Sequence, residues 1–189
     1  QMCIRDRLCF WAIQLQAKTI EEPTLLIVYS YSTKMPWTVE QRVGIEAKIK
    51  DSPNFKCNKL THKYLHGKFE KSKIESRLKE VSSFIQQSNN ICGAILLDDL
   101  AFSRLYQQLH DKNIPIVFGG VSGNMKSYGF HKGLKGISGT LENHNIPTAY
   151  KMIRTLRPSI HNFLVITEDN LSGNNLSLIH ISEPTRQDR

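Results

Sequence analysis

Two aspartates and two glycines stand directly after two apolar runs in the middle of the chain. Residues 93–97 are apolar and stop at Asp98 and Asp99, and a second apolar run stops at Gly119 and Gly120. Carboxylates can exchange protons or accept hydrogen bonds from a ligand, and glycine lets the backbone approach a ligand closely. Runs this apolar are typical of strands buried on both faces of a parallel sheet, where ligands bind beyond the carboxyl ends of the strands. The sequence therefore predicts a site at that edge of a sheet.

The aspartate pair has two interpretations. It can be a pair of ligand-binding or acid–base carboxylates, or it can be a helix N-cap followed by an acid in the first turn. A helix must begin nearby, because apolar residues recur at helical spacing just after the pair, at Phe102, Leu105, Tyr106 and Leu109. We expect one aspartate to cap this helix and the other to be free for a ligand; if Asp98 is the cap, Asp99 is the ligand contact.

No motif in the sequence supports catalysis or a nucleotide cofactor. The first apolar run is not followed by a GxGxxG pattern, and neither a P-loop lysine pattern nor a GxSxG elbow is present. His62 and His66 resemble a metal pair, but four residues of a strand span roughly 13 Å, too far for one ion. We therefore expect no enzymatic activity, no cofactor and no metal site.

Aromatic residues flank the exit of the first apolar run. Tyr31 and Trp37 follow residues 25–29, which read as a buried strand. Aromatic side chains at this place can stack on a ligand or fold over the edge of the core. The sequence leaves both possibilities open.

The apolar pattern along the chain predicts alternating strands and helices. The predicted strands are residues 25–29, 55–65, 93–97, 114–118, 137–141 and 163–166, and the predicted helices cover about 36–50, 74–85, 102–109 and 147–156. This alternation requires an α/β fold with a doubly wound parallel sheet. Residues 122–136 form a long glycine-rich loop, and loops of this length are usually functional or connect parts of a protein.

The same pattern predicts which side chains face the core. The expected inward residues are Val39, Val43 and Ala47 in the first helix, Ile74, Leu78, Val81 and Ile85 in the second, and Ala149, Met152, Ile153 and Leu156 in the last. Leu97 and Val117 each lie in a central strand and should also be buried.

Both ends of the chain read as translated sequencing adapter. Residues 2–7 (MCIRDR) can be encoded by DNA whose reverse complement, read one base out of frame, encodes residues 176–180 (LSLIH) and opens the codon of Ile181. That DNA resembles the transposon end used to prepare sequencing libraries, and residues 182–186 (SEPTR) resemble the adapter beyond it. We therefore set aside residues 1–7 and 176–189 from fold reasoning, and expect the gene to continue past this segment.

Residues 8–17 (LCFWAIQLQA) resemble the end of a secretory signal. They are apolar, too short to span a bilayer, and followed by the polar residues 18–24. The alternative is an ordinary buried segment. If the signal is removed, only Cys57 and Cys92 remain, and we expect two packed free thiols because another strand should separate their strands.

The chain carries a net charge of +8. Its lysines are scattered along the sequence and are not arranged as one stripe interleaved with aromatic residues, as in many nucleic-acid-binding surfaces. A solvated basic surface is the better interpretation, and we expect no nucleic-acid partner.

Several ordered segments resemble one known family. The segments YSYSTKMPWTVEQRVGIEAKI, ILLDDLAFSRLYQQL, IPIVFGGVSGN and ISGTLENHNIPTAYKMIRTLRP are similar to ABC-transporter substrate-binding proteins of the type 1 periplasmic-binding fold, in the tryptophan-binding-like or sensor-associated branch. The resemblance covers about residues 25–169. It implies two α/β lobes that close on a small solute, here a first lobe at residues 18–143 and the start of a second lobe at 144–175.

The resemblance also implies where the ligand binds. In the family, loops at the strand ends of the first lobe line the cleft, and the matching positions here are Ser30, Tyr31, Asp98, Asp99, Gly119, Gly120, Val121 and Ser122. Glu142 and Asn143 match the hinge where the chain first crosses into the second lobe. Most of the second lobe, and with it half of the implied site, is absent from the sequence.

These observations predict a non-enzymatic, exported protein of the periplasm or cell envelope. It would bind a small solute, such as an amino acid or a sugar, and deliver it to an ABC permease. The alternative is the extracytoplasmic sensor domain of a membrane signalling protein, and a less favoured one is an enzyme on a flavodoxin-like sheet. A cytosolic repressor of the same fold would need an upstream DNA-binding motif, and the export-like residues 8–17 argue against it.

Overall fold

The computed structural model describes residues 22–68, 70–122, 128, 135–142, 146–160, 164 and 166. The expected adapter ends, the signal-like residues 8–17 and Asn143 lie outside these residues, as does most of the loop after residue 122. The strands are β1 (Thr24–Tyr29), β2 (Lys59–Tyr64), β3 (Ile91–Leu97), β4 (Ile116–Ser122) and β5 (Ile137–Glu142). The helices are α1 (Pro36–Lys50), the short η1 (Lys71–Lys73), α2 (Ile74–Gln87), α3 (Asp98–Asp111) and α4 (Ile146–Leu156).

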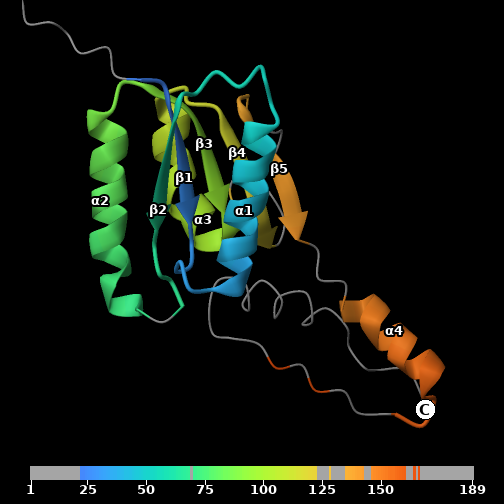
Figure 1. Cartoon of the computed structure of the whole chain (residues 1–189). Coiled ribbons are helices and arrows are strands. Elements are labelled where there is room, and N and C mark those ends of the chain that lie inside the picture. The colour runs from blue at the N-terminus through green and yellow to red at the C-terminus, as the bar shows by residue number, and fades with distance from the viewer. Residues whose placement is uncertain are drawn as a thin grey trace, which may run out of the picture.

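The five strands form one parallel sheet in the order β2-β1-β3-β4-β5. Figure 1 shows the sheet with helices in front of it and behind it. The chain first moves from β1 to β2 and then reverses direction across the sheet to β3, β4 and β5. Because such crossovers are right-handed, the reversal places α1 on one face and α2 and α3 on the other. The predicted doubly wound α/β fold is confirmed.

Burial of β1 on both faces divides the core into two clusters. Leu26 and Val28 point toward the face covered by α2 and α3, whereas Leu25 and Ile27 point toward the face covered by α1. All six residues of β1 are buried. An apolar run without alternation is what a strand between two helical layers requires.

The helical stripe predicted for α2 is confirmed, but the one predicted for α1 is wrong. Leu78, Val81 and Ile85 are buried under α2, while Val39 and Val43 of α1 are exposed and Ala47 is exposed as well. The inward face of α1 instead carries buried Thr38 and the partly buried Ile45 and Ile49, at spacings of seven and four residues. This face was overlooked because its amino-terminal half is polar.

Strand β4 does not stop at Gly119 and Gly120, as the sequence suggested, but continues through them to Ser122. Its pairing with β5 shifts register between Phe118 and Val121. Gly120 has a φ of +68°, which only glycine adopts without strain, and it forms the irregularity that lets the strand resume. Val117 is 52 % exposed, which corrects its predicted burial, while Leu97 is buried as expected.

Cys57 and Cys92 form a disulfide with their Cα atoms 6.1 Å apart, so the expectation of two free thiols is wrong. That expectation assumed that β1 lies between β2 and β3, and the strand order confirms this assumption. However, Cys57 lies before β2, where Asn58 N–H donates to the carbonyl of Pro23 and holds this segment over the start of β1. Cys92 lies where β3 shifts register against β1. The two cysteines thus meet across the end of the intervening strand.

Beyond the sheet, α4 forms as predicted, yet its expected inward residues are largely uncovered. Ala149, Met152 and Leu156 are exposed, and only Ile153 is partly buried. The predicted sixth strand is not formed at the two of its residues that the structure describes, Leu164 and Ile166, which are 81 % and 85 % exposed. Neither residue pairs with a neighbouring strand, and a strand requires a pairing partner for its backbone.

Candidate functional site

The sheet order places a topological switch point between β1 and β3. At such a point the connections leave toward opposite faces of the sheet, and a crevice opens beyond the carboxyl ends of the two strands. Ser30 follows β1 directly, and Asp98 and Asp99 follow β3 at the start of α3. Ser122 and Glu142 close β4 and β5 along the same edge. The fold therefore brings the predicted site residues to one edge of the sheet.

Ser30 belongs to the framework of this edge. Its hydroxyl donates to the carbonyl of Leu97 over 2.7 Å and accepts the N–H of Ala101 over 2.9 Å. The side chain is fully buried. Ser30 thus satisfies an unpaired N–H in the first turn of α3, which is the role of a helix cap supplied from another strand. The N-cap position of α3 is Leu97, and both aspartates lie in the first turn, so the prediction that one of them occupies the cap position is wrong.

Asp99 ties α3 to the end of β4. Its Oδ1 atom accepts the N–H of Ser122 over 2.9 Å and the hydroxyl of Tyr128 over 2.8 Å. The side chain is buried. A carboxylate that accepts two bonds from neighbouring segments is well suited to hold the edge together, so Asp99 is the more structural member of the pair.

Asp98 has a carboxylate oxygen that can still accept a hydrogen bond. Its Oδ1 atom accepts the indole N–H of Trp37 over 3.0 Å and the amide N–H of Gln41 over 3.4 Å. Its Oδ2 atom is buried and has no hydrogen-bond partner among the described residues. The residue is only 5 % exposed, and its φ of +66° is a left-handed conformation that few non-glycine residues adopt. Buried polar atoms without a partner are rare, and they mark sites that a ligand can complete.

Gly120 permits this arrangement. A Cβ atom at Gly120 would lie 2.5 Å from Oδ1 of Asp98, which is closer than two atoms can approach without displacement. Glycine at this position therefore serves both the turn of β4 and the close approach of the Asp98 carboxylate. The sequence predicted Gly120 at the site, and the structure provides the steric reason for it.

Burial governs the protonation of Asp98. Desolvation raises the pKa of the Asp98 carboxyl to about 6, while the bonds from Trp37 and Gln41 oppose the rise and the carboxylates of Glu142 and Asp99 add to it. At neutral pH the group is a desolvated anion next to other acids. It would therefore favour a ligand that donates a hydrogen bond or carries positive charge.

The other residues predicted to line the site differ in burial and in position along the strands. Tyr31 is partly buried, and Gly119 pairs with Leu97 in the ladder between β3 and β4. Val121 is fully buried in the core cluster beneath α2 and α3, so its side chain faces away from solvent. Glu142 is partly buried at the end of β5. The ligand contacts of these residues stay predictions, and the hinge residue Asn143 lies outside the described part of the chain.

Two residues of the site were missed from sequence, Thr38 and Gln41. Thr38 is almost wholly buried with an unpaired Oγ1, and Oε1 of Gln41 also has no partner among the described residues. They lie two and five residues after Pro36 and are spaced by three residues, so they share one face of α1, the face from which Gln41 bonds to Asp98. This spacing was a usable signal, but polar residues on a helix ordinarily indicate the solvent face. Trp37 is 45 % exposed and lies at the edge of this cluster.

The described residues contain no group of three or more metal-ligating side chains. His62 and His66 have separate partners: Nδ1 of His62 lies 3.1 Å from the hydroxyl of Tyr29, and Nδ1 of His66 lies 3.8 Å from a carboxylate oxygen of Glu70. Burial lowers the pKa of His62, which keeps its imidazole neutral at neutral pH. Over the part of the chain that the structure describes, no helix combines the length and apolar character needed to cross a membrane.

No protein-family model matches the chain, and no curated protein matches it. Among solved structures, it is similar to the crystal structure of the Francisella novicida lysine decarboxylase LdcF, at 13% sequence identity and a TM-score of 0.36. The likeness covers 84% of this chain but only 23% of that one. The expectation that the chain is not an enzyme is contradicted by this match to an enzyme and is dropped. A likeness at this TM-score carries no further argument about activity.

Proposed function

We propose that the chain is the first lobe of an extracytoplasmic solute-binding protein of an ABC-type import system, and that it binds a small solute at the carboxyl edge of β1, β3 and β4. The observation that carries the proposal is the Oδ2 atom of Asp98, a buried acceptor without a partner at the switch point of the sheet. Burying such an atom costs free energy that a donor on a ligand would offset. The resemblance of the sequence to the substrate-binding family supports the same interpretation.

The disulfide supports the extracytoplasmic part of the proposal. Disulfides persist in oxidising compartments such as the periplasm and are rare in the reducing cytosol. Cys57 and Cys92 are paired within the described fold. An exported protein would keep this bond, and the signal-like residues 8–17 agree with export.

The uncovered surface of α4 supports a second lobe. Met152 and Leu156 are 60 % and 70 % exposed, although they lie on the apolar stripe of an amphipathic helix. Apolar stripes of helices normally pack on a further layer of structure. A second lobe that continues after this helix would cover them, and Glu142 at the end of β5 would then mark the hinge between the lobes.

The test is calorimetric titration of the completed gene product, beginning with L-tryptophan and continuing through a panel of other amino acids and sugars. For the ligand found, Asp98→Asn should weaken binding by about tenfold or more, because a hydrogen bond to a buried charge is worth about 1.5–3 kcal/mol. Asp111→Asn is the matched control, since Asp111 ends the same helix on the exposed side. It should leave the affinity unchanged.

Two results would contradict the proposal. One is the absence of binding to every member of the panel. The other is a ligand whose affinity is the same for Asp98→Asn as for the unmodified protein, with both proteins folded by their thermal melts. The 189-residue chain should bind far more weakly than the completed protein, because two lobes that close together exclude water from the polar contacts.

A further inference from the structure

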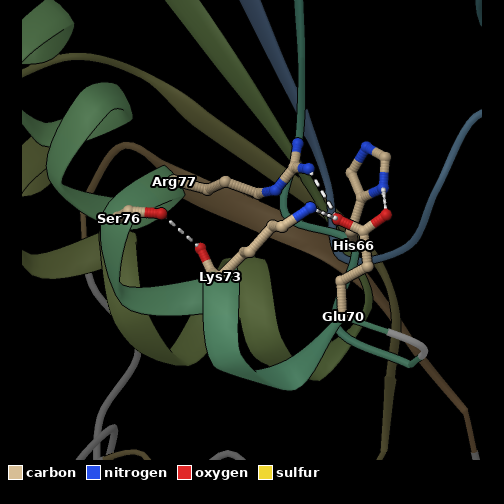
Figure 2. Close-up of polar contacts among 5 residues, drawn as sticks. All are labelled: His66, Glu70, Lys73, Ser76 and Arg77. Atoms are coloured by element: carbon tan, nitrogen blue, oxygen red, sulfur yellow. Dashed lines mark hydrogen bonds and ion pairs between the residues drawn. The ribbon is translucent and has the colours of Figure 1, made fainter.

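The acidic residues in and just before α2 are paired with basic side chains. Figure 2 shows Lys73 and Arg77 converging on the carboxylate of Glu70. Arg77 Nη2 lies 2.8 Å and Lys73 Nζ 3.4 Å from Oε2 of Glu70. Two further glutamates have the same kind of partner, Glu75 with Arg104 and Glu80 with Lys63. A chain with a net charge of +8 offers such partners readily.

Asp98 has a different environment. Its hydrogen-bond partners among the described residues are the neutral donors of Trp37 and Gln41, and both bond to the same oxygen, Oδ1. The charged groups that influence the pKa of its carboxyl are Glu142 and Asp99, which are themselves acids and raise that pKa. Because a buried charge costs free energy unless it is paired, a ligand that brings a positive charge would offset this cost.

Three oxygen atoms of this cluster lack hydrogen-bond partners among the described residues. They are Oδ2 of Asp98, Oγ1 of Thr38 and Oε1 of Gln41. Asp98 is 5 % and Thr38 1 % exposed, so neither atom is satisfied by bulk water. Thr38 and Gln41 share one face of α1, and from that face Gln41 bonds to Asp98. Carboxylate and amide oxygens are acceptors, and a hydroxyl oxygen also accepts, so the open groups match a ligand with several N–H donors.

We propose that the solute bound at Asp98 carries a primary ammonium group, which this cluster receives. The inference rests on the solute-binding function proposed above and adds the chemical class of the solute. A primary ammonium has one positive charge and three N–H donors, which correspond to the carboxylate of Asp98 and the three open acceptors. A guanidinium group fits less well, because it favours both oxygens of a carboxylate and Oδ1 is already bonded to Trp37 and Gln41.

Trp37 gives the cluster an aromatic surface that reaches solvent. Its indole N–H donates to Oδ1 of Asp98 over 3.0 Å, yet the residue is 45 % exposed. The face of an indole ring attracts cations and stacks on aromatic groups. A solute that reaches Asp98 from solvent therefore meets a surface that favours a cation, and an aromatic skeleton on the solute could stack there.

The test is calorimetric titration of the completed protein with four compounds that share one phenyl ring. Phenethylamine carries an ammonium group, L-phenylalanine an ammonium and a carboxylate, 3-phenylpropionate a carboxylate, and 2-phenylethanol a neutral hydroxyl. At least one of the two ammonium compounds should bind about tenfold or more tightly than the other two compounds, because hydrogen bonds to charged groups are stronger than neutral ones. The tighter of the two shows whether the ammonium belongs to an amine or to an amino acid.

Variants of the cluster test which residues receive the ammonium group. In Asp98→Asn the preference for phenethylamine over 2-phenylethanol should fall about tenfold or more, because the opposite charge is lost. Thr38→Val keeps the shape of the side chain but removes the acceptor, so it should weaken the binding of phenethylamine about threefold to tenfold. Thr38→Ser retains the hydroxyl and should bind like the unmodified protein. Thr33→Val, at an exposed position, is the matched control and should leave the affinity unchanged.

Two outcomes would overturn the inference. One is binding of 2-phenylethanol or 3-phenylpropionate that is as tight as the binding of both ammonium compounds. The other is a preference for phenethylamine that is unchanged in Asp98→Asn, with the variant folded by its thermal melt. If a sugar then binds in a way that depends on Asp98, the solute-binding function stands and the ammonium assignment alone fails. Failure of these compounds and of every amino acid and sugar in the panel would contradict both proposals.

Discussion

At the scale of single residues, the adjacent aspartates Asp98 and Asp99 differ in how fully their carboxylate oxygens are hydrogen-bonded. Asp99 accepts two bonds that tie α3 to the end of β4. Asp98 shares one oxygen between Trp37 and Gln41 and leaves the other without a partner among the described residues. Asp98 has a left-handed φ of +66°, and its side chain bonds to two residues of α1. Strained and unsatisfied groups of this kind persist where function requires them.

The raised pKa of Asp98 predicts a stability that depends on pH. A carboxyl whose pKa is higher in the fold than in the unfolded chain contributes stability below its unfolded pKa of 3.8, and this contribution is lost as the pH rises through about 6. Asp98→Asn cannot ionise and should therefore gain about 1–3 kcal/mol over the unmodified protein near pH 7.5, with the difference vanishing near pH 4. Urea denaturation at the two pH values measures it. A difference that is the same at both would show that Asp98 does not titrate as described.

Gly120 should not tolerate a side chain. Gly120→Ala combines a φ of +68° with a Cβ placed 2.5 Å from Asp98, so it should cost about 1–3 kcal/mol of unfolding free energy. Gly44→Ala is the matched control, since a Cβ there meets nothing within 4 Å inside α1. That variant should instead gain about 0.5–1 kcal/mol by favouring the helix. Equal effects of the two changes on the denaturation midpoint would disprove the steric role of Gly120.

At the scale of elements, the two central strands differ in how completely they are covered. Strand β3 lies under α1 on one face and under α3 on the other, and Leu97 packs with the α1-side cluster. Strand β4 is covered by α3, but its opposite face carries the exposed Val117. Ile45 and Ile49 of α1 pack with the cluster that contains Leu25, Ile27 and Tyr29 of β1 and Leu97 of β3.

This asymmetry predicts different costs for two truncations. Leu97→Ala should lower the free energy of unfolding by about 2–4 kcal/mol, because it removes a buried side chain and leaves a cavity. Val117→Ala should cost less than about 0.5 kcal/mol, as is usual for exposed positions. Chemical denaturation of the chain measures both. A loss at Val117 as large as that at Leu97 would show that a further element covers β4.

At the scale of the whole molecule, the disulfide joins the segment before β2 to β3 across the end of β1. It closes a loop between positions 35 residues apart in sequence. Cross-links of this length restrict the unfolded chain and also hold the amino-terminal edge of the sheet together. Both effects stabilise the fold without touching the carboxyl edge, where the candidate site lies.

Loss of the disulfide should therefore weaken the fold while leaving the site in place. For a loop of this size the stabilisation is about 3–4 kcal/mol, so Cys57→Ser with Cys92→Ser should lower the urea midpoint accordingly. The unmodified protein in excess dithiothreitol should match the double variant, and dithiothreitol should not affect the variant further. An unmodified protein whose midpoint is insensitive to the reductant would show that the thiols are unpaired in solution.

Much of the architecture could be predicted from the sequence, because local apolar patterns determine strands and helices. The apolar run at β1 and the helical stripe of α2 predicted their elements with little error, and the alternation of elements required the parallel α/β sheet. A parallel sheet in turn places strand ends at one edge, so Asp98, Gly120 and Ser122 could be expected near each other. These inferences depend only on periodicity and on the rules of chain connection.

The tertiary structure decided which groups are satisfied and which are not. The bond from Ala101 N–H to Ser30 and the bond from Ser122 N–H to Asp99 join residues 71 and 23 positions apart, and no local pattern encodes such contacts. The same holds for Oδ2 of Asp98, whose lack of a partner among the described residues depends on how the elements pack. The meeting of Cys57 with Cys92 likewise depended on how a loop crosses the end of β1. Sequence patterns determine which elements form, whereas the exact distances on which hydrogen bonds and disulfides depend arise only when those elements pack.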